Sequence, residues 1–281
     1  MKSEITSPVR QIGDEPAALL QTRGFLRRHD ELLLACLAIL VFAALWELLP
    51  GLGLVNPLFT SSPSRILQAA VWLFQHGFWN DLGVSAEEFG LGMVAAFLVG
   101  IPGGILLGWY RRLNAMFDPF VQGINAMPRV ALLPLLILWL GIGAESKIAV
   151  VFLGALFPIL LNAAVGVRGM DPALVRCARA FGASDRQIFT SIALPGSLPL
   201  ILTGVRLAIG RGLIGVVVGE MLVSTAGVGH MMSIASASFQ TDKVFVGVII
   251  LAGFGVVFSG LLRRLENRLE PWRTNPRGEV L

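Results

Sequence analysis

Long apolar runs separated by short polar segments organise this chain. Hydrophobic stretches predict membrane spans over residues 32–49, from just after Glu87-Glu88 to about 110, and over 148–167, 198–222 and 244–262. A further apolar stretch, residues 117–140, is interrupted by three prolines, an asparagine and an arginine. Such a segment predicts a broken helix shielded by protein or a watery cavity, because freed backbone groups are not tolerated against lipid. The pattern therefore predicts an all-α integral membrane protein with six transmembrane helices.

The polar segments between these runs carry an uneven distribution of positive charge. With both termini placed in the cytoplasm, sixteen Lys and Arg residues fall on the cytoplasmic side, and only Arg65, Lys147 and Lys243 fall outside. Since cytoplasmic segments are enriched in Lys and Arg, this asymmetry predicts cytoplasmic N and C termini. We expect a partly disordered cytoplasmic tail over 1–31, a transmembrane domain over 32–262 and a cytoplasmic tail over 263–281. Residues 1–31 lack the apolar run of a cleavable signal peptide.

Composition supports the membrane assignment. The 281 residues are 55% hydrophobic and 14% charged, with a mean hydropathy of +0.75, whereas soluble domains carry about 25% charged residues. The net charge of +4 lies in short segments between apolar runs, which is typical of topology signals and not of a surface that binds nucleic acid. Cys36 and Cys177 form no disulfide framework.

Small and polar residues inside the predicted spans indicate close helix packing. Gly100, Gly104 and Gly108 recur at every fourth position, and the fifth span is rich in glycine, so neighbouring helices can approach closely. Asn162, within the fourth span, predicts an interhelical hydrogen bond. Outside the spans, an amphipathic helix is expected after Ser62-Pro63-Ser64, and a short outer helix or re-entrant segment within residues 231–240.

The chain contains no recognisable catalytic group. It lacks a phosphate-binding loop, because none of its three lysines follows a glycine. Its three histidines lie in different segments at spacings that match no metal site. We therefore expect neither catalytic residues nor a metal site here, and if ATP drives this protein, the nucleotide must bind a partner.

Residues 171–195 form the most distinctive polar segment. Asp171 and Pro172 predict the start of a short helix, and Gly182 predicts its end in a left-handed conformation. Ser184 and Gln187 have the spacing of a capping box that begins a second helix. We expect Pro195 to stop that helix.

The same residues resemble a known family. Ala178, Gly182, Ile192, Leu194 and Pro195 match the EAA loop of ABC-importer permeases, and the run from Gly182-Ala-Ser through Leu194-Pro-Gly to Arg206 resembles the nitrate/sulfonate/taurine branch. Arg176 replaces the glutamate of the motif, and Cys177 stands at its first alanine, so the role of that glutamate does not carry over. The resemblance implies a coupling loop within residues 168–195 that docks on an ATPase through Arg176, Ala178, Phe181, Gly182, Ala183, Ser184, Ile192, Leu194 and Pro195.

The resemblance also implies an assembly. A permease of this type has type I importer architecture in a bacterial inner membrane, and pairs with a second copy of itself, two ATPase subunits that hold ATP and Mg²⁺, and an extracytoplasmic solute-binding protein. It binds no nucleic acid and no cofactor of its own. The solute is expected to be small and anionic, such as a sulfonate, taurine or nitrate.

Polar residues at membrane depth are candidates for the translocation path or its gate, because burying them there is unfavourable. Two readings stay open for the acidic one, Glu220: it lines or gates the path, or it binds backbone or a neighbouring helix near the outer gate. A carboxylate on the path would repel an anion, which favours the structural role. Arg129 either draws an anion inward or serves topology. The candidates are Asn125, Arg129, Asn162, Arg206 and Glu220.

Two other classes of protein compete with the importer reading. A stand-alone secondary transporter or channel would be supported by internal repeats with matched broken helices, and the interrupted stretch 117–140 has no clear counterpart. A membrane enzyme such as a lipid-modifying transferase would need Asp, His or Glu clustered at one membrane face, and the sequence offers isolated ones. The segment 171–195 also has a simpler interpretation, as a basic loop that only sets topology.

Overall fold

The computed structural model describes residues 17–269, which form helices and the turns that join them. The chain divides into two compact units, Met1–Ser64 and Arg65–Leu281. The first contains α1 (Ala17–Gly51), with a candidate span over Leu33–Gly51, and the short α2 (Pro57–Thr60). The Trp46 indole donates to the Thr60 carbonyl at 3.0 Å, and Glu47 accepts from the Ser64 hydroxyl at 2.6 Å. Residues 17–31 of the predicted tail are helical, and the rest of that tail lies outside the described residues.

The second unit holds the other spans. Four helical segments are long and apolar enough to cross a membrane, and α5 with η1–α6 forms a further pair bent by 89°. Counted as one crossing, this bent pair completes the predicted six, and it is the interrupted stretch that predicted a broken helix. The helices that follow α2 are α3 (Pro63–Gln75), α4 (Phe78–Trp109), α5 (Arg111–Ala126), η1 (Arg129–Leu132), α6 (Leu133–Leu140), α7 (Ala144–Arg168), α8 (Pro172–Ala180), α9 (Asp185–Ile188), the π-helix η2 (Phe189–Ala193), α10 (Leu194–Val223), α11 (Val228–Ala237) and α12 (Thr241–Leu269).

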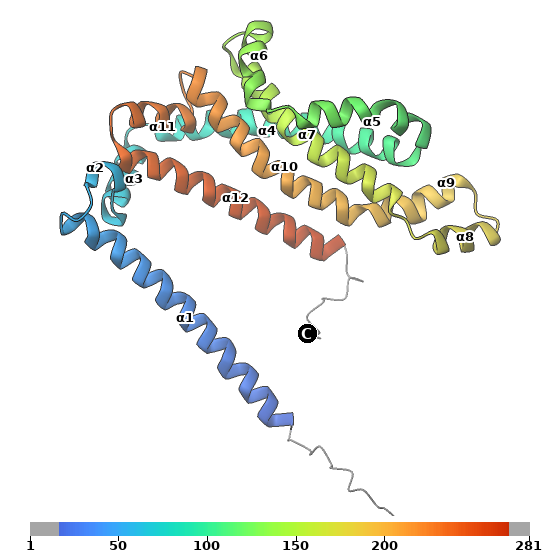
Figure 1. Ribbon diagram of the computed structural model, residues 1–281, viewed down its shortest axis with the longest axis horizontal. Coiled ribbons are helices and arrows are strands. Elements are labelled where there is room, and N and C mark those ends of the chain that lie inside the picture. Colours follow the sequence, from blue (N-terminus) through green and yellow to red (C-terminus); the bar gives the residue numbers. More distant parts are fainter. Residues whose placement is uncertain (1–16, 270–281) are drawn as a thin grey trace, which may run out of the picture. The chain divides into compact units, whose positions relative to one another are not determined.

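Helix α7 packs along both α4 and α10 (Figure 1). Glycines permit the close approach: a Cβ at Gly104 of α4 would lie 2.6 Å from the Ala163 Cβ, and one at Gly204 of α10 would lie 2.8 Å from the Asn162 Cβ. Contacts this short exclude a side chain, so the predicted close packing of the glycine ladder and of the fifth span is confirmed. The two interfaces join α4, α7 and α10 into the core of the bundle.

Aromatic contacts attach α12 to this core. The Phe89 ring of α4 packs edge-on against Phe254 and Phe258 of α12, at centroid distances of 5.5 and 6.2 Å. Helix α11, the short outer helix expected from the sequence, packs against α4, α10 and α12. Aromatic burial of this kind contributes a large share of packing energy.

Two predicted boundaries need correction. Helix α4 begins at Phe78, so Glu87-Glu88 does not precede the second span but lies inside it. Helix α7 begins at Ala144, and Lys147, predicted in an outer segment, lies buried in its first turns. Both errors have one cause. A charge at the edge of an apolar run predicts a solvent-exposed span end, whereas Glu88 and Lys147 form a buried ion pair inside the bundle.

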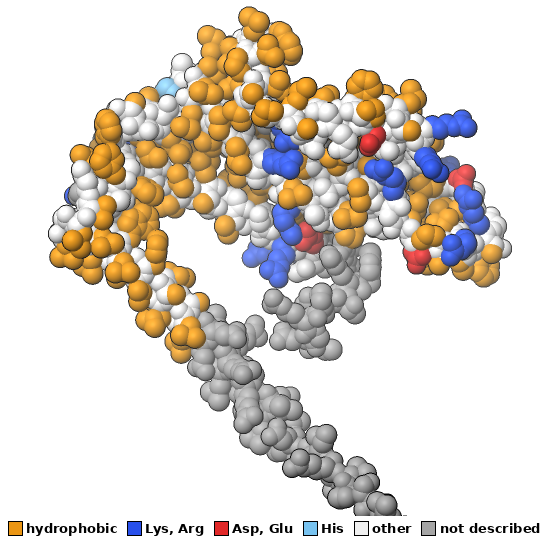
Figure 2. Space-filling model, in the orientation of Figure 1, with side chains coloured by type: hydrophobic (Ala, Val, Ile, Leu, Met, Phe, Trp, Pro, Cys, Tyr) orange, Lys and Arg blue, Asp and Glu red, His pale blue; other side chains and the backbone are white. Residues whose placement is uncertain are grey.

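The loop helices and the outer helix occupy opposite ends of the bundle. Helix α10 starts directly after α9 and η2 and ends just before α11, and Figure 1 shows α8 and α9 at the far end of α7 and α10 from α11. In Figure 2, basic side chains gather at the α8–α9 end and near the middle of the visible face, among mainly hydrophobic side chains.

Candidate coupling loop and buried polar groups

The predicted caps of the loop 171–195 are present. The Asp171 carboxylate accepts from the Ala173 N–H at 2.7 Å, with Pro172 opening α8. Gly182 adopts φ +82°, the left-handed conformation that favours glycine. Ser184 and Gln187 form a reciprocal capping box at the start of α9. Local sequence signals therefore set the ends of the two short helices in this loop.

The loop presents an apolar and basic surface. No residue of α8 is buried; Phe181 is 89% exposed and Leu174 56%. Arg176 and Arg179 are also exposed, and Arg179 contacts Asp185 at 3.3 Å. Exposed aromatic and arginine side chains on a rigid element are typical of a protein-binding surface.

The C-terminal side of the loop is anchored to the bundle. Ile188 and Ala193 are buried, and the Phe189 ring packs edge-on against Trp109 of α4 at 5.0 Å. Gly182 and Ser184 are exposed on the loop and Ala183 is half-buried, while Ile192 and Leu194 lie on the anchored side.

The prediction that Pro195 ends the second helix is wrong. The π-helix η2 joins α9 to α10, and Pro195 lies in the first turn of α10. A proline is tolerated there because its missing N–H has no partner in a first helical turn. Residues Asp185–Val223 consequently form one continuous helical segment of 39 residues, which links the loop directly to a membrane span.

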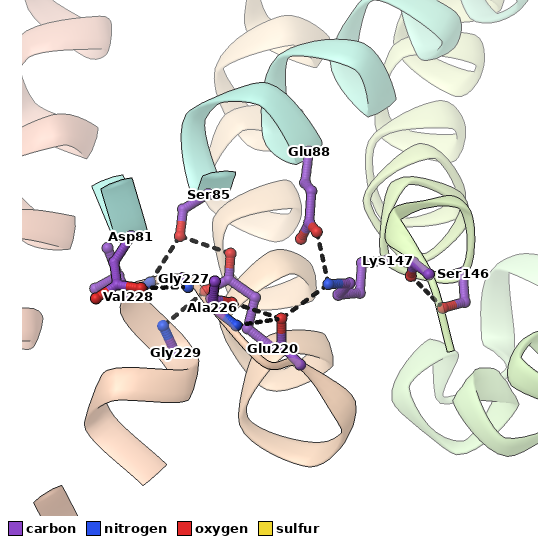
Figure 3. Close-up of polar contacts among 12 residues, drawn as sticks. Asp81, Ser85, Glu88, Ser146, Lys147, Glu220, Ala226, Gly227, Val228 and Gly229 are labelled. Atoms are coloured by element: carbon purple, nitrogen blue, oxygen red, sulfur yellow. Dashed lines mark hydrogen bonds and ion pairs between the residues drawn. The ribbon is translucent and has the colours of Figure 1, made fainter. Parts of the chain in front are cut away.

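A buried polar cluster lies at the opposite end of the bundle (Figure 3). The Lys147 ammonium of α7 contacts Glu88 of α4 at 2.6 Å and donates to the Ser224 hydroxyl, after α10, at 2.9 Å. The second Glu88 oxygen is buried with no partner among the described residues. Breaking a buried ion pair on one side is strongly destabilising, so this cluster ties α4 and α7 to the end of α10.

Glu220 belongs to the same end and is fully buried. Its carboxylate accepts from the Ser85 hydroxyl at 2.6 Å and from the Gly229 N–H at 2.7 Å. Gly227 adopts φ +113°, and a Cβ there would lie 2.5 Å from the Glu220 carboxyl carbon, so only glycine fits. The neighbouring backbone is held too, since Asp81 accepts from the Gly227 N–H at 2.9 Å. This arrangement matches the structural reading of Glu220, as an anchor for the turn before α11.

The other candidate residues form separate groups. Arg206 of α10 contacts Glu266 of α12 at 2.6 Å. Arg129 donates to the side chain of Asn125 at 2.6 Å and to its carbonyl at 3.1 Å. The predicted interhelical bond of Asn162 is wrong, because its amide donates to the Pro158 carbonyl of the same helix at 2.8 Å. The Asn162 Cβ lies at the close α7–α10 contact that Gly204 permits.

Sequence reasoning missed the partners of Glu220 and the whole Glu88–Lys147 pair. A usable signal was present: Ser85 and Glu88 are three residues apart and share a face of an apolar helix, as charges with a buried role do. Within residues 17–269, no group of three or more His, Cys, Asp or Glu residues lies close enough to hold a metal ion.

Taken together, the structure is that of an integral membrane protein, a bundle of membrane-spanning helices with a capped, exposed loop at one end. Comparison with known protein families identifies the class of membrane protein. The family described as "binding-protein-dependent transport system inner membrane component" matches residues 100–271. The chain belongs to this family and is the membrane-spanning permease subunit of an ABC importer. Membership implies an ATPase and a solute-binding protein as partners.

Several curated proteins are similar over most of their length. The taurine transport permease TauC of Escherichia coli is 34% identical, covering 93% of this chain and 95% of the relative. The putative aliphatic sulfonates permease SsuC of Bacillus subtilis is 36% identical, covering 85% and 87%. The formylaminopyrimidine permease ThiX of Halalkalibacterium halodurans is 29% identical, covering 88% and 99%.

A solved structure shares the fold. A chain of the MetNI methionine ABC transporter, from a study of its inward-facing conformations, superimposes with a TM-score of 0.58. The match covers 70% of this chain and 96% of that chain at 19% identity. At this identity the likeness establishes the fold alone, which is that of an ABC-importer permease.

Proposed function

We propose that this chain forms the translocation path of an ATP-driven importer for a small sulfonate such as taurine. The observation that carries the proposal is the 34% identity to a taurine permease over 93% of the chain, supported by a second relative named for aliphatic sulfonates. Two copies form the path, two ATPase subunits bind beneath them, and a solute-binding protein delivers the solute from outside.

Hydrolysis of ATP takes place on the partner ATPase, where ATP and Mg²⁺ bind, and this chain is non-catalytic. The loop docks on that partner through Phe181 and Leu174, which the structure leaves exposed, and through Arg176. Burial of such side chains in a partner groove supplies most of the energy of an interface.

The continuous segment Asp185–Val223 gives this docking a mechanical consequence. At 1.5 Å per residue its 39 residues extend about 58 Å from the loop to the far end of the bundle. Movement of α9 by the ATPases passes through η2 into α10 and reaches the Glu220 cluster, which holds α11. Rigid-body rotation of such packed helices is an established way of switching between two conformations.

The experiment is reconstitution of the permease with its ATPase and binding protein in proteoliposomes. The proposal expects uptake of labelled taurine or an alkanesulfonate that requires both internal ATP and the binding protein. Uptake by the permease alone would show a secondary carrier instead. ATP-dependent uptake of a formylaminopyrimidine with no uptake of any sulfonate would keep the importer and overturn the solute.

A further inference from the structure

Two arginines lie beside the same part of α7, near the point where the broken span bends. Arg129 is the first residue of η1, directly after the break between α5 and η1–α6. Helix η1 contacts both α7 and α10, and the Arg211 backbone of α10 lies against Gly154 of α7. Two arginines from distant parts of the sequence therefore lie beside one turn of α7, between Gly154 and Phe157.

The pair lies midway along the bundle. The Arg129 guanidinium stands 5.6 Å from the Phe157 ring centre, and the Arg211 carbonyl would lie 3.2 Å from a Cβ at Gly154. Phe157 is thirteen residues into the 25-residue α7, which is about 20 Å from its start at 1.5 Å per residue. This depth is too great for the two arginines to serve as membrane-surface topology signals.

Neither arginine has a carboxylate partner among the described residues. The buried Lys147 contacts Glu88, and Arg206, five residues before Arg211, contacts Glu266. Arg129, in contrast, bonds the neutral Asn125, and its Nε is buried without a hydrogen-bond partner. Two like charges at membrane depth are unfavourable unless an anion or water compensates them.

Arg211 lies on an exposed face of α10. Thr203, Gly210 and Arg211 are exposed on this face, together with the hydrophobic Leu207 and Ile214. A charged side chain on such a face contacts a water-filled cavity or another protein, not hydrocarbon. The position of Arg211 therefore indicates contact with water or protein on this face of α10.

We propose that Arg129 and Arg211 form an anion-binding subsite at the midpoint of the translocation path, which receives the sulfonate group of the solute. Guanidinium groups bind the oxygens of such anions with paired hydrogen bonds, and Asn125 orients Arg129 through its side-chain oxygen. The inference rests on the proposed function, because it assigns residues to the path that this function requires.

The test uses the complete importer in proteoliposomes, with Arg129→Gln, Arg211→Gln and the charge-retaining Arg211→Lys. Arg264→Gln, which removes an exposed arginine from α12, is the matched control. We expect each Gln variant to lower the maximal rate of taurine import by about tenfold or more, the effect of losing a hydrogen bond between charged groups. The import rate of Arg211→Lys should lie between that of the native importer and that of Arg211→Gln. The rate of Arg264→Gln should stay within twofold of the native rate. Complex assembly and ATP hydrolysis stimulated by the binding protein should persist, because a subsite acts on the solute and not on the fold.

Three outcomes would overturn the subsite. The first is native import by both Gln variants, and the second is parallel loss of assembly, ATP hydrolysis and import, which shows a structural role. The third is a phospholipid that native mass spectrometry finds bound to the native importer and absent from both Gln variants, because the anion would then be a lipid phosphate. Failure of the native importer to transport any sulfonate would instead refute the proposed function.

Discussion

Glu88 of α4 and Lys147 of α7 form an ion pair of 2.6 Å, with 3% and 6% of their side chains exposed. The pair joins helices 59 positions apart in sequence at the end of the bundle where α11 is anchored. Because each charge is buried, it depends on the other, and the stability of this end of the permease depends on both.

Removing one partner should destabilise the permease more than removing both. Lys147→Met leaves Glu88 buried and unpaired, which costs about 3–5 kcal/mol, whereas Glu88→Leu combined with Lys147→Met should recover most of that loss. Thermal unfolding of the detergent-purified protein measures both variants. Additive losses in the double variant would show that the two side chains are not coupled.

Adjacent glycines in α4 offer a matched test of helix packing. Gly104→Ala places a Cβ 2.6 Å from the Ala163 Cβ, while Gly103→Ala meets its nearest neighbour at 3.6 Å. We expect Gly104→Ala to lower stability by about 1–3 kcal/mol through overpacking. Gly103→Ala should be neutral or stabilising by up to about 1 kcal/mol, because alanine favours the helix. Equal effects at the two positions in the same unfolding assay would contradict the α4–α7 interface.

The Glu220 anchor should be intolerant of change in its turn. Gly227→Ala combines a φ of +113° with a Cβ only 2.5 Å from the Glu220 carboxyl carbon, so the turn must shift and its hydrogen bonds must weaken. Hydrogen exchange should then rise in α11 and stay unchanged in α8. A uniform rise across the chain would indicate global unfolding instead, and no rise in α11 would contradict the anchor.

Topology is testable with a native cysteine. Cys177 is exposed on the loop, and Cys36 is the other cysteine of the chain. In a Cys36→Ser background, a membrane-impermeant maleimide should label Cys177 in inside-out vesicles and not in right-side-out ones. The reverse pattern would place the loop outside and remove the basis of the coupling proposal.

Local signals in the sequence predicted local structure well. The caps at Asp171 and Ser184 and the left-handed Gly182 depend on neighbours within four residues, so spacing alone identifies them. The glycine ladder of α4 also predicted close packing against another helix, because a helix face without side chains lets a neighbouring backbone approach.

Long-range pairing could not be predicted in the same way. A charge near a span end has the same local pattern whether it faces water or a buried partner, so Glu88 and Lys147 were assigned to the surface. A proline is common both in the first turn of a helix and just after the end of one, so the local sequence around Pro195 fits either placement. The structure decides between them, because the π-helix before Pro195, whose Phe189 packs against Trp109, runs directly into α10.

The central claim is that the loop 171–195 couples this permease to an ATPase, and Phe181 tests it most directly. Its ring is 89% exposed, so Phe181→Ala should leave the stability of the permease unchanged. Binding of the ATPase should weaken roughly thirtyfold, as for loss of an interface anchor worth about 2 kcal/mol. Phe59→Ala, at a 64% exposed phenylalanine in the other unit, is the control. The measurement is ATPase affinity of the purified permease in nanodiscs: selective loss in Phe181→Ala supports the account, and native affinity in that variant contradicts it.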